Sequence, residues 1–185
     1  QTSDEKRNEK NVPDEFIMEE NTSVAEISKI IWNSFLGSNS CIDWDCMKFL
    51  EDAFHNSDDP KNEVSFYYYT IKNTEGKILA MTFCTFGIWK DDMLATESVS
   101  KHLEIVRKTN PLYLTSKVFS MGCLFTEGNH FYIDEKDVQA KKALAFLIGK
   151  LENKYNELNA DMLVLRDFAE DNAWEKQIQE QGFIR

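Results

Sequence analysis

Apolar and polar residues alternate along this chain with a period that changes near residue 63. Before that point apolar residues recur every three to four positions, which predicts one helix near 23–36 and a second one capped by Asp43. Ser23 and Glu26 have the spacing of a capping box, in which each side chain satisfies a backbone amide at the start of a helix. The first third of the chain is therefore expected to be helical.

After residue 63 the pattern becomes that of strands. Residues 64–71 and 77–86 are rich in β-branched and aromatic side chains, and the sequence Asn-Thr-Glu-Gly at 73–76 predicts a hairpin turn between them. The remaining elements are expected to be a short helix over 99–106, a strand region over 117–133, a long helix over 135–158, a strand over 162–165 and a helix over 172–181. This order predicts an α/β fold.

Composition narrows the class of protein. The chain has 185 residues, enough for one sizeable core. Residues 1–15 are polar and predict a disordered tail, which leaves 16–185 as a single domain. The net charge of −11 argues against nucleic acids and anionic membranes as partners. No apolar run approaches the roughly 20 residues that span a bilayer, so no transmembrane segment is expected.

Cysteine and histidine spacing excludes the common metal-site patterns. The four cysteines form no C-x-x-C pair and are mostly flanked by apolar residues, so buried reduced thiols and a cytoplasmic location are expected. Three histidines are scattered along the chain without a His-x-x-x-His pair. No metal site is therefore expected.

A polar cluster interrupts the strand region of 117–133. Residues 126–130 read Thr-Glu-Gly-Asn-His between two apolar runs. Glutamate and histidine are the groups most often used to move protons near neutral pH, so Glu127 and His130 are the candidate catalytic residues. A bulge at Gly128 would turn both toward one cleft. The alternative for this cluster is a polar strand edge with a structural role. A nucleophilic pair of Cys123 and His130 is also conceivable, and the alternative for Cys123 is a cysteine packed in the core.

Further polar residues are candidates for substrate binding. Arg166 and Asp167 follow a buried strand at its carboxyl end, where ligands collect in open α/β sheets; an ion pair or a helix cap would serve structure instead. The other candidates are polar residues in the loops and short helix around the central strand, namely Asp91, Asp92, His102, Arg107, Tyr113, Lys117 and Asn129. For the acids at 91 and 92 and for Arg107, a charged turn and a surface ion pair remain the structural alternatives.

Several strings resemble a known family. The element order, with a hairpin at 66–80 and a polar central strand, is similar to that of GNAT acyltransferases, over roughly residues 23–185. The strings at 111–116 (PLYLTS), 126–130 (TEGNH) and 165–168 (LRDF) resemble those of FemABX-like members, including a group that accompanies PLP-dependent α-oxoamine synthases. The resemblance implies a mixed, mostly antiparallel central sheet flanked by helices, whose last strands are truncated at residue 185.

The resemblance also implies an activity. It is the transfer of an acyl group from a thioester to a primary amine, with a sphingoid-type lipid precursor as one candidate acceptor. The donor would be acyl-CoA or an acyl-carrier protein as co-substrate, with no bound cofactor. The chain departs from the pattern at 134–140, where three acids replace the glycine-rich loop that holds the coenzyme A pyrophosphate. A FemABX-type aminoacyl or peptidyl transferase and a non-catalytic GNAT module remain the alternatives.

Overall fold

The computed structural model describes residues 15–37, 41–55, 57, 60–168 and 173–184. The predicted tail at 1–15 lies outside the described residues, except for Glu15. That carboxylate accepts a hydrogen bond from Nζ of Lys142 at 2.9 Å. The last residue of the predicted tail is thus in contact with the folded domain.

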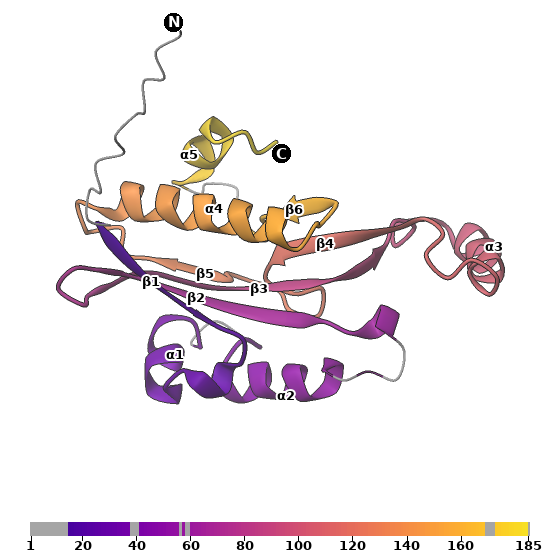
Figure 1. The fold of residues 1–185 in the computed structure, drawn as a ribbon, viewed down its shortest axis with the longest axis horizontal. Helices are drawn as coiled ribbons and strands as arrows, with labels where there is room; N and C mark the ends of the chain where they lie inside the picture. The colour runs from indigo at the N-terminus through magenta and orange to yellow at the C-terminus, as the bar shows by residue number, and fades with distance from the viewer. Residues whose placement is uncertain (1–14, 38–40, 56, 58–59, 169–172, 185) are drawn as a thin grey trace, which may run out of the picture.

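A six-stranded sheet with helices on both faces forms the molecule (Figure 1). The strands are β1 (Phe16–Asn21), β2 (Ser65–Asn73), β3 (Ile78–Lys90), β4 (Thr115–Met121), β5 (Phe131–Ile133) and β6 (Met162–Val164). Their order is β1-β2-β3-β4-β6, and β5 also pairs with β3. Among the strands of the described residues, β4 and β6 form the only parallel pair. The expected α/β fold, with a mixed, mostly antiparallel sheet flanked by helices, is confirmed.

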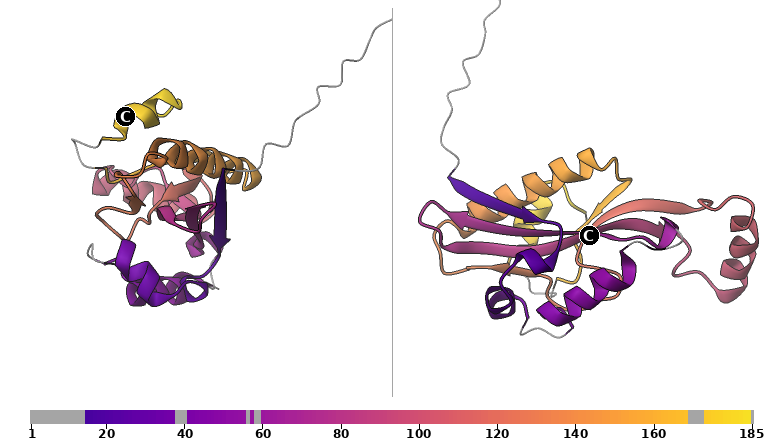
Figure 2. Two further views of the ribbon diagram at one scale, coloured as in Figure 1. Left: turned by 90° about the vertical axis from the view of Figure 1, so that its left-hand side faces the viewer. Right: turned by 60° about the horizontal axis from the view of Figure 1, so that its bottom comes forward.

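Helices cover the two faces unequally (Figure 2). The helices are α1 (Lys29–Phe35), α2 (Trp44–Phe54), α3 (Glu97–Arg107), α4 (Ala140–Glu157) and α5 (Glu175–Glu180), with 3-10 turns η1 (Val24–Glu26) and η2 (Pro60–Asn62). Helix α4 lies on one face and α1 and α2 lie on the other. The core therefore has two parts, one under α4 around Leu147 and Phe119, and one under α1 and α2 around Trp32 and Phe83.

Local signals were accurate where a side chain caps a helix or a turn demands glycine. The capping box of Ser23 and Glu26 is present, and Asp43 accepts the amide of Cys46 at 2.8 Å. The hairpin between β2 and β3 turns at Gly76, whose φ of 84° favours glycine. The short helix at 99–106 is α3, which is longer than the apolar positions alone predicted.

Several predicted boundaries are wrong. The single helix at 23–36 is the turn η1 followed by α1, because Ile27 is extended at φ −109°. Strand β1 was not predicted, since its residues mix acids with apolar side chains on a sheet edge. The long helix begins at Ala140 rather than at 135, and α5 is shorter than 172–181, part of which lies outside the described residues. Cys41 is exposed rather than buried.

The predicted strand over 117–133 is also interrupted. Residues 122–130 leave the ladder between β4 and β5, which both pair with β3. The excursion begins at Gly122, whose φ of 79° lies in the left-handed region. At the break Gly122 still contacts β3: its amide donates to the carbonyl of Phe83 at 2.9 Å, and its carbonyl accepts a hydrogen bond from the hydroxyl of Thr85 at 2.8 Å. The polar cluster at 126–130 thus lies on a loop and not in a strand.

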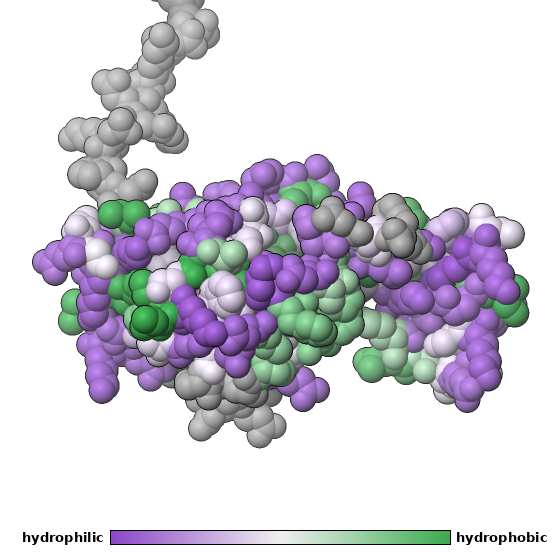
Figure 3. Space-filling view, turned by 90° about the horizontal axis from the view of Figure 1, so that it is seen from below, coloured by the Kyte–Doolittle hydropathy of each residue, from purple (hydrophilic) through white to green (hydrophobic). Residues whose placement is uncertain are grey.

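One part of the molecule projects beyond the sheet. We call residues 87–117 the arm: the end of β3, helix α3 and the start of β4, of which β3 and β4 pair with each other from Gly87↔Val118 to Lys90↔Thr115. Strand β2 pairs with β3 only as far as Phe86. Beyond that point β3 and β4 form a ribbon of two strands that is about 13 Å long. Figures 1 and 3 show α3 at its far end, joined to the body by a narrow waist.

None of the helices in the described part of the chain combines the length and the apolar character needed to cross a bilayer.

Candidate active site

The strand gap is the place where β4 and β6 stop pairing. Their parallel ladder ends at Ser120 and Val164. Beyond it β5 continues along β3, while the chain after β6 carries Arg166 and Asp167. No strand of the described residues pairs with the other edge of β5. A free strand edge beside a diverging chain can receive an extended ligand through backbone hydrogen bonds.

His130 fills this gap from the β5 side. Its side chain is fully buried, with its ring edge-on to Phe83 at a centroid distance of 5.4 Å. A Cβ added at Gly122 would lie 2.4 Å from Nδ1 of His130. Glycine is therefore required at position 122 for two reasons: the backbone has a positive φ there, and the imidazole occupies the space that a Cβ would need.

The hydrogen bonds of Thr126 favour the tautomer of His130 that carries its proton on Nε2. The hydroxyl of Thr126 donates to the carbonyl oxygen of Cys123 at 3.2 Å. The oxygen of that hydroxyl lies 2.8 Å from Nε2 of His130 and therefore accepts the Nε2 proton. In the neutral imidazole Nδ1 then keeps its lone pair, and it has no hydrogen-bond partner among the described residues.

Nδ1 of His130 faces a carboxylate. Oδ2 of Asp167 lies 3.4 Å away, which is long for a hydrogen bond but close for an ion pair if the imidazole is protonated. Nε of Arg166 lies 3.1 Å from the same oxygen, and another nitrogen of this guanidinium donates to the carbonyl of Cys123 at 3.1 Å. The backbone of Asp167 has φ 62°, an uncommon value for a residue other than glycine.

These contacts set the protonation of the imidazole. Burial lowers the pKa of His130, Asp167 raises it by attraction, and Arg166 lowers it by repulsion; burial is the largest cause. The pKa of His130 thus lies below its ordinary value, and the neutral ring is the dominant form at pH 7. A neutral imidazole with a free Nδ1 can accept a proton, and Asp167 would stabilise the resulting cation.

Glu127 does not share the environment of His130. Glu127 and Asn129 are exposed, whereas His130 is 1% exposed. The side chain of Asn129 accepts the amide of Phe131 at 3.2 Å, which caps the start of β5. The charges that act on the imidazole come from Asp167 and Arg166. The carboxylate that the structure places beside His130 is thus that of Asp167, while the loop places residue 127 at the surface.

A pocket of about 370 Å³ lies next to the same loop. Cys123, Leu124 and Phe125 form one of its walls, while Thr126 and Gly122, on the flanks of that segment, contact His130. The other walls come from the end of α2, the segment after η2 and the base of the arm, including Phe54, Val64, Thr85, Gly87, Ile88 and Trp89. Phe54 and Phe125 stack with a centroid distance of 4.3 Å. The lining is mixed: the aromatic and aliphatic side chains share it with Thr85 and with the polar residues Ser57, Lys61, Asn62 and Glu63.

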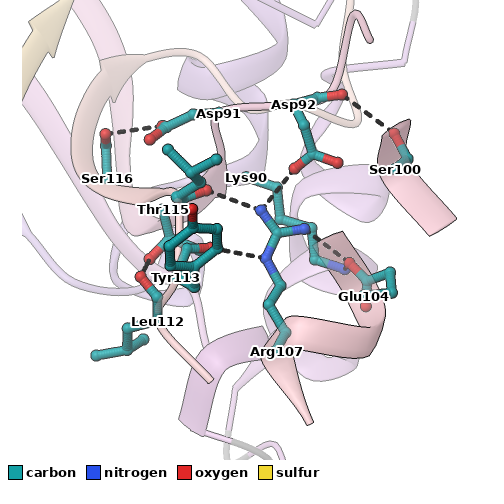
Figure 4. A network of polar contacts seen from close by, with 11 residues as sticks. Lys90, Asp91, Asp92, Ser100, Glu104, Arg107, Leu112, Tyr113, Thr115 and Ser116 are labelled. Carbon is teal, nitrogen blue, oxygen red and sulfur yellow. Dashed lines mark hydrogen bonds and ion pairs between the residues drawn. The ribbon is translucent and has the colours of Figure 1, made fainter. Parts of the chain in front are cut away.

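The structure places six of the predicted binding residues on the arm, away from His130. Arg107 binds Oδ1 of Asp92 at 2.6 Å and Oε1 of Glu104 at 2.8 Å (Figure 4). It also donates to the carbonyls of Tyr113 and Leu114, at 2.9 and 2.8 Å. These contacts raise the pKa of Arg107 and lower that of Asp92, mainly through their mutual hydrogen bond. Arg107 and Asp92 therefore hold the arm together through these contacts.

The remaining arm candidates have structural contacts or lie at the surface. Asp91 accepts a hydrogen bond from the hydroxyl of Ser116 at 2.8 Å. His102 and Lys117 are exposed, and the side chain of Tyr113 is 41% exposed. The arm ribbon leaves the sheet about 20 Å along β3 from the segment that pairs with β5. These residues and His130 do not form one site.

The N-terminus of α4 is closed by carboxylates of this chain. Oδ1 of Asp137 accepts the amide of Gln139 at 2.9 Å. Lys77 binds Asp134 at 2.8 Å and Asp137 at 2.6 Å. These contacts lower the pKa of Asp137, most strongly through Lys77, so this acid is ionised at neutral pH. A pyrophosphate at this position would meet negative charge, in agreement with the missing glycine-rich loop.

In the described part of the chain no group of three His, Cys, Asp or Glu side chains converges in a way that could hold a metal ion.

Comparisons with known proteins add little to this description. No family model and no curated protein matches the sequence. Among solved structures, the chain is similar to one described as "Crystal structure of a probable acetyltransferase", with 15% identity over 91% of this chain and 90% of the other. The TM-score is 0.49. A likeness of this degree says nothing about the activity of this chain.

The residues that meet at the strand gap are Gly122, Thr126, His130, Arg166 and Asp167. The sequence indicated three of them as site residues and did not indicate the other two. His130, Arg166 and Asp167 were candidates, but they were not expected to meet. Thr126 had no assigned role, although its spacing of four from His130 allows contact across a turn. Gly122 and the pocket were missed because both depend on where the loop leaves the sheet, which no local pattern indicates.

Proposed function

We propose that this chain is an acyltransferase that moves an acyl group from a thioester to a primary amine at the strand gap. The observation that carries the proposal is the His130–Asp167 pair, which lies where β4 and β6 part beside the free edge of β5. The free edge supplies backbone groups for the amides of an extended thioester arm. The pair supplies a proton acceptor at the same place.

In this proposal Asp167 meets the amine first. Its side chain is 26% exposed, whereas that of His130 is fully buried behind it. The carboxylate would bind and orient the attacking amine, whose nitrogen forms a bond to the thioester carbon. The proton lost by the amine passes by way of the Asp167 carboxylate to Nδ1 of His130, and the thiolate leaves with the carbon–sulfur bond electrons. Arg166 holds Asp167 in place through its contacts to Oδ2 and to the carbonyl of Cys123.

The pocket next to the loop is the proposed site for the acceptor. Its aromatic side chains suit the apolar body of an amine, and its polar residues, which include Glu63 and Thr85, suit the polar end of such a molecule. A sphingoid-type amine is the long-chain member of that class. Acyl-CoA and a thioester on an acyl-carrier protein both remain donors in the proposal, and neither would have its pyrophosphate or phosphate bound at the closed N-terminus of α4.

The test is to incubate the full chain with acyl thioesters of several lengths and with short and long apolar amines, and to measure amide by mass spectrometry. Acyl-CoA and acyl-pantetheine should be compared directly. We expect amide formation with both, since the nucleotide has no site at α4. Absence of product with every donor and amine would contradict the proposal.

A non-catalytic role is the second candidate. It is favoured by the closure of α4 by Asp137 and by the burial of His130. In that case neither thioester would raise the melting temperature, because a ligand that binds only the folded state stabilises it. No described contact favours aminoacyl or peptidyl transfer.

A further inference from the structure

The far end of the arm carries an apolar surface that the fold does not cover. We define the tip surface as Met93, Leu94, Leu112, Tyr113 and Leu114, whose exposed fractions range from 41% to 102%. The two segments lie together because Arg107 binds Asp92 on one side and the carbonyls of residues 113 and 114 on the other. The amide of Asp91 also donates to the carbonyl of Leu114 at 3.1 Å. Exposed apolar groups that gather in this way mark an interaction surface.

A second apolar surface lies at the opposite end of the arm. We define the base surface as Leu124 and Phe125, which are 37% and 54% exposed, together with Trp89 beside them in the lining of the pocket. Figure 3 shows hydrophobic residues on this underside of the molecule, from the body toward the waist, and again at the far end. The arm thus has an apolar surface at each end.

The charge of the arm differs from that of the body. Residues 87–117 contain five lysines and arginines against four acids, whereas the whole chain has 21 against 32. The arm is therefore net +1 and the rest of the chain is −12. The negatively charged bodies of two copies repel each other. The positively charged arm of one copy is attracted to the negatively charged body of another.

We propose that two copies of this chain form a symmetric dimer in which each tip surface docks on the base surface of the other copy and thereby borders the pocket proposed for the acceptor. Two arms that lie side by side in opposite directions place each tip next to the base of the other, so a twofold axis satisfies both contacts at once. Each copy then contributes two patches to the contact, and a standard interface buries about 800 Å² per partner. The contact also supports a ribbon of two strands, which is marginal by itself.

The test is sedimentation velocity of the full chain over a range of concentrations. We expect a dimer in the wild type, and a weakening of the dissociation constant by about tenfold or more in Leu94→Glu, because a charge would be buried in the contact. Phe125→Glu should weaken it similarly. Val138→Glu is the matched control, since Val138 is 97% exposed outside both surfaces, and it should leave the dimer unchanged. Circular dichroism checks that each variant is folded.

Mixing the two variants distinguishes this arrangement from others. Leu94→Glu keeps an intact base surface and Phe125→Glu keeps an intact tip, so the mixture should form a heterodimer through one intact contact. A monomeric wild type would overturn the proposal. So would a dimer that Leu94→Glu does not weaken, or one weakened by that change but not by Phe125→Glu, which would indicate contact between the two tips. None of these readouts depends on activity.

Discussion

The arm and the strand gap are both organised around one buried nitrogen-containing side chain, but they use its polar atoms differently. On the arm, Arg107 binds two carboxylates and two carbonyls, so the guanidinium is fully engaged. In the gap, His130 has a partner for Nε2 and none for Nδ1 except a carboxylate at 3.4 Å. A satisfied network stabilises structure, whereas an unsatisfied buried atom indicates a site where a proton or a ligand is expected.

The largest expected effect tests which carboxylate assists His130: Asp167, which the structure places beside it, or Glu127, which the sequence suggested. Asp167→Asn keeps the shape of the side chain but removes the charge that stabilises protonated His130. We expect about a 100-fold loss of acyl transfer, typical for the removal of a proton-transfer group. Glu127→Gln should have a much smaller effect, because residue 127 is exposed. The measurement is the amide formation rate of both variants.

Glu97→Gln on α3 is the control for charge removal, since its side chain is 81% exposed on the arm. If Glu127→Gln lost as much activity as Asp167→Asn, the result would support the sequence-based prediction that Glu127 acts together with His130. If neither variant lost activity, the gap would not be the catalytic centre.

The next effect concerns the space that His130 requires. Gly122→Ala introduces a Cβ 2.4 Å from Nδ1 at a backbone φ of 79°. We expect a loss of about 2–4 kcal/mol in the free energy of unfolding, from the left-handed backbone and from overpacking. Urea denaturation measures it.

Gly149→Ala is the matched control, because Gly149 lies within α4 and a Cβ there would meet nothing within 4 Å. That change should stabilise the protein by about 0.5–1 kcal/mol. A neutral Gly122→Ala would mean that His130 can leave the gap without cost.

A smaller and more local effect is expected on the arm. Arg107→Met removes the group that joins α3 to residues 92, 113 and 114 while keeping the length of the side chain. The arm should then be cleaved by protease before the body, and the melting temperature should fall by a few degrees. Lys101→Met is the control, since Lys101 is 74% exposed and pairs only with Glu97. Equal protease resistance in the two variants would contradict a structural role for Arg107.

The same comparison explains what the sequence could predict. Capping residues and the hairpin turn act on their immediate neighbours, so Ser23, Asp43 and Gly76 were interpreted correctly. Arg107 and Asp92 were candidates for binding because a sequence pattern does not show whether a charge is already paired. Their pairing depends on a contact across 15 residues.

The gap shows the opposite case. The cluster at 126–130 was recognised as unusual, but its partner Asp167 lies 37 residues beyond His130 and comes near it only because β6 pairs in parallel with β4. The strand pattern also predicted a continuous strand through this cluster, since apolar residues flank it on both sides. The positive φ at Gly122 overrides that pattern, and sequence periodicity cannot indicate it.

The smallest expected effect is a pH dependence that only the gap should show. Burial lowers the pKa of His130 in the folded protein below the ordinary value of 6.5. Below pH 6.5 the unfolded chain therefore binds a proton on this imidazole while the folded chain does not. The stability that the neutral ring provides is complete above that pH and declines as the pH falls toward the lowered pKa. The melting temperature of the wild type should accordingly decrease more steeply between pH 7 and pH 5 than that of His130→Gln, in which no group titrates at this position. Equal slopes would mean that Asp167 compensates the burial completely, which would contradict a lowered pKa of His130 in the folded protein.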